Sequence, residues 1–192
     1  MKPIFNEDTL SESPAIAQLQ RMGYGYIHGD ELDPELRDDC ERASRRDVIL
    51  VSRLKKKLTE INPHLTEESI NKAVRRITHI HAENLIEANR TFHQDLVAGI
   101  SINQDIGAKR QKLTVRYIDF DDPEKNEFLV VNQFWVKGPQ ETDRPDIVIF
   151  INGIPIIVIE CKSPVARQMG ISQAITQLQR YQEEIPQLFH TN

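Results

Sequence analysis

Three ionisable residues stand at the two ends of a strongly apolar hairpin near the C-terminal end of the chain. Asp146 precedes the apolar run 147–151, and Glu160 and Lys162 follow the apolar run 154–159. Burying an ion is costly unless a partner compensates its charge, and a divalent metal is a natural partner for two carboxylates. Carboxylate oxygens, waters and a phosphate oxygen are the hard ligands that Mg²⁺ prefers. The spacing therefore predicts a divalent-metal site at one end of this hairpin.

Whether the two carboxylates meet depends on the register of the hairpin. Asn152-Gly153 between two β-branched runs is a strong signal for a tight turn. A two-residue loop alone would put Asp146 and Glu160 on opposite faces, because side chains alternate with a period of two. One extra loop residue, in a type I turn followed by a glycine bulge, would pair them, and Pro155 argues against a regular ladder. We predict the bulged register; a strict two-residue turn with no other bulge would exclude a shared site.

The residues after the second apolar run have separable roles. Glu160 and Lys162 are two apart on one strand and face the same way, so the ammonium would lie beside an attacking water or stabilise developing negative charge. A metal at the carboxylates would lower the pKa of that water. Cys161 points to the other face, which predicts a thiol in the core. The plainer alternative is a solvated turn acid followed by a charged strand exit, because the pattern D-x(13)-E-x-K alone is weak.

A helix is predicted after the hairpin, and it carries a second polar pair. Apolar residues recur at helical spacing over 171–178, and Pro186 lies just beyond. Gln177 and Tyr181 are four apart and share one face of this helix. Taken by themselves, these two residues fit a Tyr181 ring that packs on the sheet and a Gln177 side chain that caps its hydroxyl.

Asp146 with Glu160-x-Lys162 resembles the motif of the PD-(D/E)xK nuclease superfamily. With Gln177 and Tyr181 added, the pattern resembles the nuclease domain of the restriction (HsdR) subunit of type I restriction enzymes, and RecB-like nucleases share the arrangement. The resemblance extends over most of the chain. The matching segments are Thr9 to Pro14, Leu19, Met22-Gly23-Tyr24, Asp47 to Leu50, Arg53-Leu54, Leu58, Asn62-Pro63, Asn89 to His93 and Val97 to Gly99.

This resemblance implies a DNA-cleaving enzyme domain with little sequence preference, in which Gln177 and Tyr181 would hold DNA or a loop near the metal. It implies Mg²⁺ as cofactor, with Mn²⁺ able to substitute, held by Asp146, Glu160 and the backbone carbonyl of Cys161. The family's first helix often carries a glutamate near the metal, and Glu12 is the matching residue. Glu12 could equally occupy the first turn of a helix, where a negative charge complements the helix dipole. The sequence leaves both interpretations open.

The resemblance also implies partners outside this chain. Such subunits carry an ATP-dependent DNA-translocating motor behind the nuclease domain, and they work on double-stranded DNA with modification and specificity subunits. The chain contains no G-x-x-x-x-G-K-[ST] loop, so ATP would act only through a motor region beyond it. We therefore expect the N-terminal fragment of a longer subunit. A standalone or repair-associated nuclease of the same superfamily, and a non-catalytic module that docks DNA or a subunit, remain as alternatives.

Composition is consistent with one cytoplasmic domain over residues 1–192. The chain is 39% hydrophobic and 28% charged, and it carries a net charge of −5. No apolar run approaches the length of about 18 residues that a membrane span needs, and the N-terminus lacks a secretory signal. Two cysteines, at positions 40 and 161, fit a reducing compartment. An acidic chain must bind DNA through local patches.

The periodicity predicts an α+β fold, with a helical part over about 9–99 and a sheet part over about 110–189. Helices are expected over 13–21, 35–61 and 66–98, the last with a possible break near 83–84, an N-cap at Thr66 and a C-terminal cap at Gly99. Strands are expected over 113–120 and 128–137, before the hairpin. Together, these elements predict a mixed sheet flanked by helices. The family resemblance implies that this is a restriction-endonuclease-like core.

A basic stretch over 42–57 has three interpretations. It could contact phosphates, dock the motor, or form the solvated side of an amphipathic helix. The last is favoured because apolar residues are interleaved at helical spacing. They are Val48, Ile49, Val51, Leu54 and Leu58.

Overall fold

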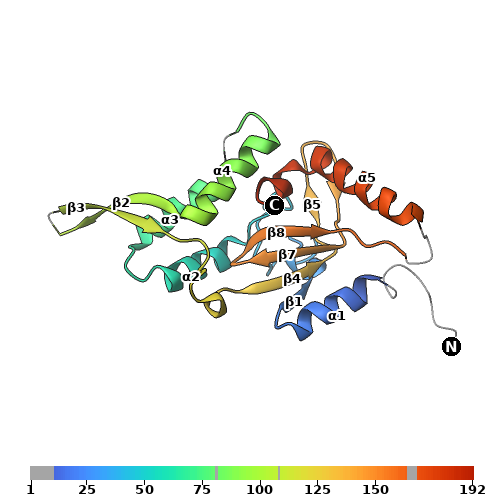
Figure 1. Ribbon diagram of the computed structural model, residues 1–192, viewed down its shortest axis with the longest axis horizontal. Coiled ribbons are helices and arrows are strands. Elements are labelled where there is room, and N and C mark those ends of the chain that lie inside the picture. Colours follow the sequence, from blue (N-terminus) through green and yellow to red (C-terminus); the bar gives the residue numbers. More distant parts are fainter. Residues whose placement is uncertain (1–10, 81, 108, 164–167) are drawn as a thin grey trace.

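The computed structural model describes residues 11–80, 82–107, 109–163 and 168–192 (Figure 1). Thr9 and Leu10, which open the family resemblance, lie outside these residues. The α-helices are α1 (Ser13–Arg21), α2 (Val51–Ile61), α3 (Glu67–Thr78), α4 (Leu85–Ala98) and α5 (Gln168–Glu184). The strands are β1 (Gly25–His28), β2 (Ile100–Ile106), β3 (Lys109–Val115), β4 (Phe128–Asn132), β5 (Val136–Lys137), β6 (Thr142–Asp143), β7 (Ile147–Ile151) and β8 (Ile154–Ile159). Short 3₁₀ helices are η2 (Gly29–Leu32), η3 (Pro123–Lys125) and η5 (Pro186–His190).

A mixed sheet forms the centre of the fold. Its strand order is β1-β4-β7-β8, in which β1 and β4 are parallel and the other pairs are antiparallel. Helix α1 lies on one side of the sheet and α5 on the other (Figure 1). Strands β2 and β3 form a separate hairpin that projects away from this core, and β5 and β6 form a second small pair. The predicted α+β class, with a mixed sheet flanked by helices, is confirmed.

Alternation along the strands sorts the core into two layers. Ile147 and Ile149 face α1 and pack with Ile16. Val148 and Phe150 face the other way and pack in the larger cluster that includes Tyr181 of α5. Both faces of the sheet are covered, which explains why the two strands of the β7–β8 hairpin are almost continuously apolar. No helix among the described residues has the length and apolarity required to cross a membrane.

The register predicted for the β7–β8 hairpin is confirmed, but the position of the extra residue is not the predicted one. Asn152 and Gly153 form a two-residue turn with both φ angles positive, 53° and 81°, as a type I′ turn requires. The bulge lies further along, where the ladder shifts between the Ile149 and Phe150 rungs and β8 carries its extra residue beside Pro155. A proline cannot donate to the ladder, so the bulge falls where a hydrogen bond is already missing.

The N-terminus of α2 packs directly on this turn. The amide of Leu50 donates to the carbonyl of Gly153 at 2.8 Å. A Cβ atom on Gly153 would come within 2.5 Å of the Leu50 carbonyl oxygen. Glycine at position 153 therefore satisfies both the positive φ and the close approach of two backbones.

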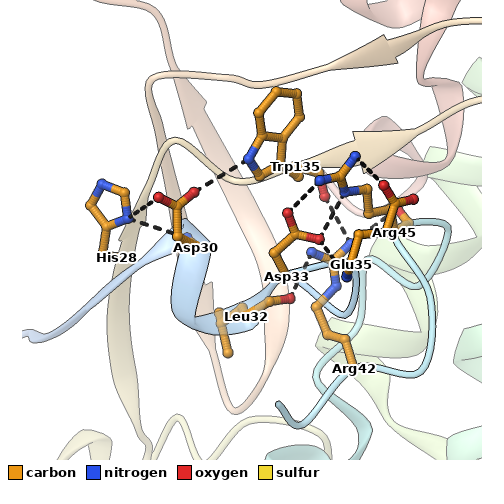
Figure 2. Close-up of polar contacts among 8 residues, drawn as sticks. All are labelled: His28, Asp30, Leu32, Asp33, Glu35, Arg42, Arg45 and Trp135. Atoms are coloured by element: carbon orange, nitrogen blue, oxygen red, sulfur yellow. Dashed lines mark hydrogen bonds and ion pairs between the residues drawn. The ribbon is translucent and has the colours of Figure 1, made fainter. Parts of the chain in front are cut away.

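The helix expected over 35–61 is shorter than predicted, since α2 begins only at Val51 and residues 35–50 are irregular. The guanidinium of Arg42 is the reason. It is buried inside this loop and donates to the backbone carbonyls of Leu32, Arg45 and Trp135 (Figure 2). It also donates to the backbone carbonyl of Asp47. Carbonyls that point at one buried side chain cannot also continue a helical ladder.

The helix expected over 66–98 is divided at the predicted place. The side chains of Thr66 and Asn84 accept from backbone amides as the N-caps of α3 and α4. Gly99 ends α4 with a φ of 71°. The N-cap at Thr66, the break near 83–84 and the glycine cap are therefore confirmed.

The strand expected over 113–120 is shifted, because β3 covers Lys109–Val115. The Asn62 side-chain amide bonds both the N–H and the carbonyl of Arg116, so the ladder ends there. The strand expected over 128–137 is interrupted at Gln133, whose φ is 52°. Strands β1 and β2 were not predicted. Strand β1 has only four residues, and polar residues obscure the apolar alternation along β2.

Candidate active site

The hairpin register brings Asp146 and Glu160 to the same edge of the sheet. Ile147 is paired with Ile159, so the next residues outward, Asp146 and Glu160, lie across from one another. The amide of Cys161 donates to Asp146 Oδ2 at 2.7 Å, which fixes one carboxylate against the opposite strand. The geometry required for a shared site is therefore present, whereas the chemistry of that site stays a prediction.

Glu160 and Lys162 form a close and largely buried pair. The Lys162 ammonium donates to Glu160 Oε1 at 2.5 Å, and the Glu160 side chain is only 2% exposed. Its second oxygen, Oε2, is buried without a hydrogen-bond partner among the described residues. Burial raises the pKa of Glu160, and the neighbouring Asp146 charge adds to this effect, while Lys162 opposes it. An unpartnered buried carboxylate oxygen suits the binding of a cation.

The raised pKa of Glu160 predicts a stability that depends on pH. A raised carboxyl pKa means that the protonated form stabilises the fold below the ordinary value of 4.5, and that this contribution is lost as pH rises through the raised value. Glu160→Gln should therefore unfold at a higher temperature than the wild-type chain at neutral pH in EDTA. The difference should vanish below pH 4.5. Thermal unfolding followed by circular dichroism across this range checks both parts, and a gap that widens in acid would contradict the argument.

Tyr181 of α5 packs over the face of the sheet that carries Glu160. Its ring is buried in the main core, and Gln177 Nε2 donates to its hydroxyl at 2.7 Å. Burial, together with the charges of Glu160 and Asp146, raises the pKa of Tyr181 to about 12, although the hydrogen bond with Gln177 opposes this rise. The predicted shared face is confirmed. The contacts match the packing alternative, and they also place the phenol beside the carboxylates.

Glu12 belongs to the same polar network. It is 5% exposed, and its carboxylate accepts from Asn132 Nδ2 at 2.8 Å and from Gln133 Nε2 at 2.9 Å. Gln133 Nε2 also lies 3.3 Å from Asp146 Oδ1, so one amide group links the two acids. Glu12 is the N-cap residue of α1 but makes no side-chain capping bond. Its side chain is therefore directed to the candidate site and not to its own helix.

Asn132 and Gln133 were not predicted as site residues from the sequence. A usable signal was present, because a polar dipeptide ends the buried strand β4 directly beside the hairpin strand that Asp146 begins. Gln133 adopts the left-handed φ of 52°, which is uncommon for a residue other than glycine. This backbone turns its side chain between Glu12 and Asp146. Its own N–H donates to the Asp146 carbonyl at 2.9 Å.

The residues at this edge fit a hard divalent ion. No three His, Cys, Asp or Glu side chains within the described parts of the chain are grouped to hold a metal. Asp146 and Glu160 would supply two carboxylates, and carbonyl, water and phosphate oxygens would complete the shell that Mg²⁺ requires. The thiol of Cys161 is buried with Ile147 on the α1 side, so the predicted core position is confirmed. Its carbonyl stays a predicted ligand.

The basic stretch over 42–57 does not form one solvated helix face. Arg42 is buried, and Arg45, Arg53 and Lys57 are in ion pairs with acids. The apolar residues expected to point inward are largely buried as predicted; they are Val48, Ile49, Val51, Leu54 and Leu58. The interpretation as an amphipathic helix is therefore correct for the apolar residues, which point inward. It is wrong for the cations, most of which are not solvated but form local contacts that stabilise the fold.

Comparison with known proteins identifies the family. The sequence profile described as "Type I restriction enzyme R protein N terminus" matches residues 4–192. A protein of Methanocaldococcus jannaschii, the "Putative type I restriction enzyme MjaIXP endonuclease subunit", is 40% identical over 187 residues, which cover 96% of this chain and 18% of the relative. The "Type I restriction enzyme HindI endonuclease subunit" of Haemophilus influenzae is 30% identical over 190 residues, 98% of this chain and 18% of its own length. The chain thus spans less than a fifth of these relatives, and it belongs to the family of type I restriction enzyme R protein N termini.

Proposed function

We propose that this chain is a Mg²⁺-dependent endonuclease domain that hydrolyses DNA phosphodiester bonds with little sequence preference, as part of a type I restriction R subunit. One observation carries the proposal. Asp146 and Glu160 lie at the same sheet edge, and the buried Glu160 Oε2, beside Lys162, has no hydrogen-bond partner in the described parts of the chain. Relatives named as restriction endonuclease subunits support it.

Each residue at this sheet edge would have its own role in metal binding or hydrolysis. Asp146 and Glu160 would hold the metal, together with the carbonyl of Cys161. The bound ion would supply Lewis-acid activation of the phosphoryl group and a water of lowered pKa. Lys162, already held by Glu160, would orient the attacking water or stabilise the charge that develops on phosphorus. Gln133 would keep the Asp146 carboxylate in place.

Glu12 and the α5 pair would act around this centre. Glu12, linked to Asp146 through the Gln133 amide, would add negative charge near the metal. Gln177 and Tyr181 would form the wall above Glu160 and limit the access of water to it. A drier site strengthens each electrostatic contact within it.

The proposal includes the setting in which the domain works. Double-stranded DNA would be the substrate, and the modification and specificity subunits would direct the enzyme to it. ATP would be used only by a motor region of the same subunit, outside the residues of this chain. The cytoplasm is the compartment in which such a complex would meet DNA.

Metal binding tests the proposal directly. Titration calorimetry with Mn²⁺, with and without a short DNA duplex, should give a saturable isotherm for the wild-type chain and none for Asp146→Ala. Asp105→Ala, at an exposed acid on the distant β2–β3 hairpin, is the matched control and should bind as the wild type does. Equal isotherms for the wild type and Asp146→Ala in the presence of DNA would favour the non-catalytic docking module instead.

A further inference from the structure

An arginine that forms no ion pair with any described carboxylate lies beside the candidate active site. Arg144 is exposed and stands two residues before Asp146. Within the described residues, no Asp or Glu lies within ion-pair distance of its guanidinium, and its interaction is with an aromatic ring. A cation without an ion-pair partner among the described residues is available to an anionic ligand.

Two other arginines of this region, Arg45 and Arg180, already form ion pairs with carboxylates. Arg45 pairs with Asp33 at 2.5 Å and with Glu35 at 2.7 Å. Arg180 of α5 pairs with Asp143 at 3.3 Å, as well as with Glu184 at 3.1 Å. Their charges stabilise loops and the α5 contact with β6. Arg144 therefore differs from both in having its charge directed to solvent.

Trp135 holds Arg144 in place. The guanidinium carbon of Arg144 lies 4.7 Å from the centroid of the indole ring. This contact follows from the topology, because β5 and β6 pair Val136 with Asp143, and one step further outward Trp135 faces Arg144. A stacked guanidinium keeps its N–H donors free at its edge, so the stack orients the group without consuming its hydrogen bonds.

The indole ring is itself fixed from the body of the protein. Arg45 lies over the same ring at 4.6 Å, and the indole Nε1–H donates to Asp30 Oδ1 at 3.4 Å (Figure 2). Arg45 is in turn held by the buried Asp33. Trp135 is thus a rigid support, and little side-chain freedom remains for Arg144 to lose when it binds a ligand.

We propose that Arg144, stacked on Trp135, binds a phosphate of the DNA backbone next to the phosphate that Asp146 and Glu160 would place for cleavage. This inference rests on the proposed function. The arginine fork matches phosphate geometry. Because Arg144 precedes Pro145, extended backbone is favoured there, and two extended residues span roughly 6.6–6.8 Å, comparable to the separation of successive phosphates.

The surroundings of Arg144 support an anionic ligand. The whole chain has a net charge of −5, so DNA contact must depend on local cations. Helix α5, which reaches the neighbouring Asp143 through Arg180, carries no acidic residue from Gln168 until Glu183. The surface beside Arg144 on that side therefore adds little repulsion for a phosphate backbone.

The position of Trp135 provides the test, because it is the single tryptophan of the chain. Titration of the 192-residue chain with a short DNA duplex in Ca²⁺ should reduce the quenching of its fluorescence by iodide. In Arg144→Ala, duplex binding followed by anisotropy should weaken about tenfold. The slope of log K against log salt should become shallower by about 0.9. Arg144→Lys should retain the slope but show less protection from iodide.

Arg110→Ala is the matched control, since it removes one exposed arginine from the distant β2–β3 hairpin and should leave the affinity and the slope unchanged. Equal effects of Arg110→Ala and Arg144→Ala, no effect of Arg144→Ala, or no duplex binding by the wild-type chain would each overturn the inference. Metal binding by the wild type together with loss of that binding in Asp146→Ala would still support the proposed function. The two ideas therefore fail on different measurements.

Discussion

Replacement of Asp146, Glu160 or Lys162 by alanine should each abolish DNA cleavage by the assembled restriction enzyme in which we place this chain, while its ATP hydrolysis continues. Either carboxylate variant would remove one of the two carboxylates that we propose as metal ligands. Loss of Lys162 removes a charge that would act in the transition state, and we expect a fall of about 10²–10³-fold or more. Cleavage of a circular plasmid and release of inorganic phosphate, measured in the same reaction, separate the two activities.

The matched controls for this experiment lie on the β2–β3 hairpin, which projects away from the sheet edge (Figure 1). Asp105→Ala and Lys112→Ala remove one exposed acid and one exposed base, and both should cleave as the wild type does. Loss of ATP hydrolysis in the Asp146, Glu160 and Lys162 variants would indicate a failure of assembly. Retained cleavage in all three would refute the catalytic assignment.

Local sequence patterns predicted the parts of the site that lie within one hairpin or one helix. The spacing of Asp146 and Glu160, with Asn152-Gly153 between the runs, was enough to require a bulge. Its position could not be predicted, because an extra residue anywhere between the turn and the carboxylates gives the same register. Gln177 and Tyr181 were placed correctly because helical spacing alone puts them on one face.

Contacts between residues far apart in the sequence could not be predicted in this way. Gln133 joins Glu12 to Asp146 across a sequence separation of 121 on one side and 13 on the other. Its role depends on a strand order that no local pattern specifies. The helix over 35–61 was overextended for the same reason. Its period of apolar residues was correct, but Arg42 binds the carbonyl of Trp135, 93 residues away, and tertiary contacts override local propensity.

Arg42→Ala should be the most destabilising single change in the N-terminal half of the fold, with a loss of about 3–5 kcal/mol in the free energy of unfolding. The guanidinium is 4% exposed, donates to four backbone carbonyls at 2.9–3.2 Å and stacks on Phe134 at 4.1 Å. Burial lowers its pKa to about 10, so the fold already sustains a desolvated cation because these contacts compensate it. Alanine would leave the carbonyls without a donor, and each such group costs about 1–3 kcal/mol when it stays buried.

The consequences of losing Arg42 should reach the candidate active site. One of its four partners is the Trp135 carbonyl, two residues from Gln133, so Arg42 connects the loop over 33–50 to the edge of the sheet that carries the candidate site. Urea unfolding should show the loss of stability directly, and the melting temperature should fall on the order of 10 °C.

Arg42→Lys, which keeps a charge but not the planar fork, should recover only part of the lost stability. The exposed neighbour Arg46 is the control, because Arg46→Ala should change stability by no more than about 0.5 kcal/mol. If the two alanine variants unfolded alike, the carbonyls around Arg42 would have to be satisfied in another way, and the loop would not depend on this side chain.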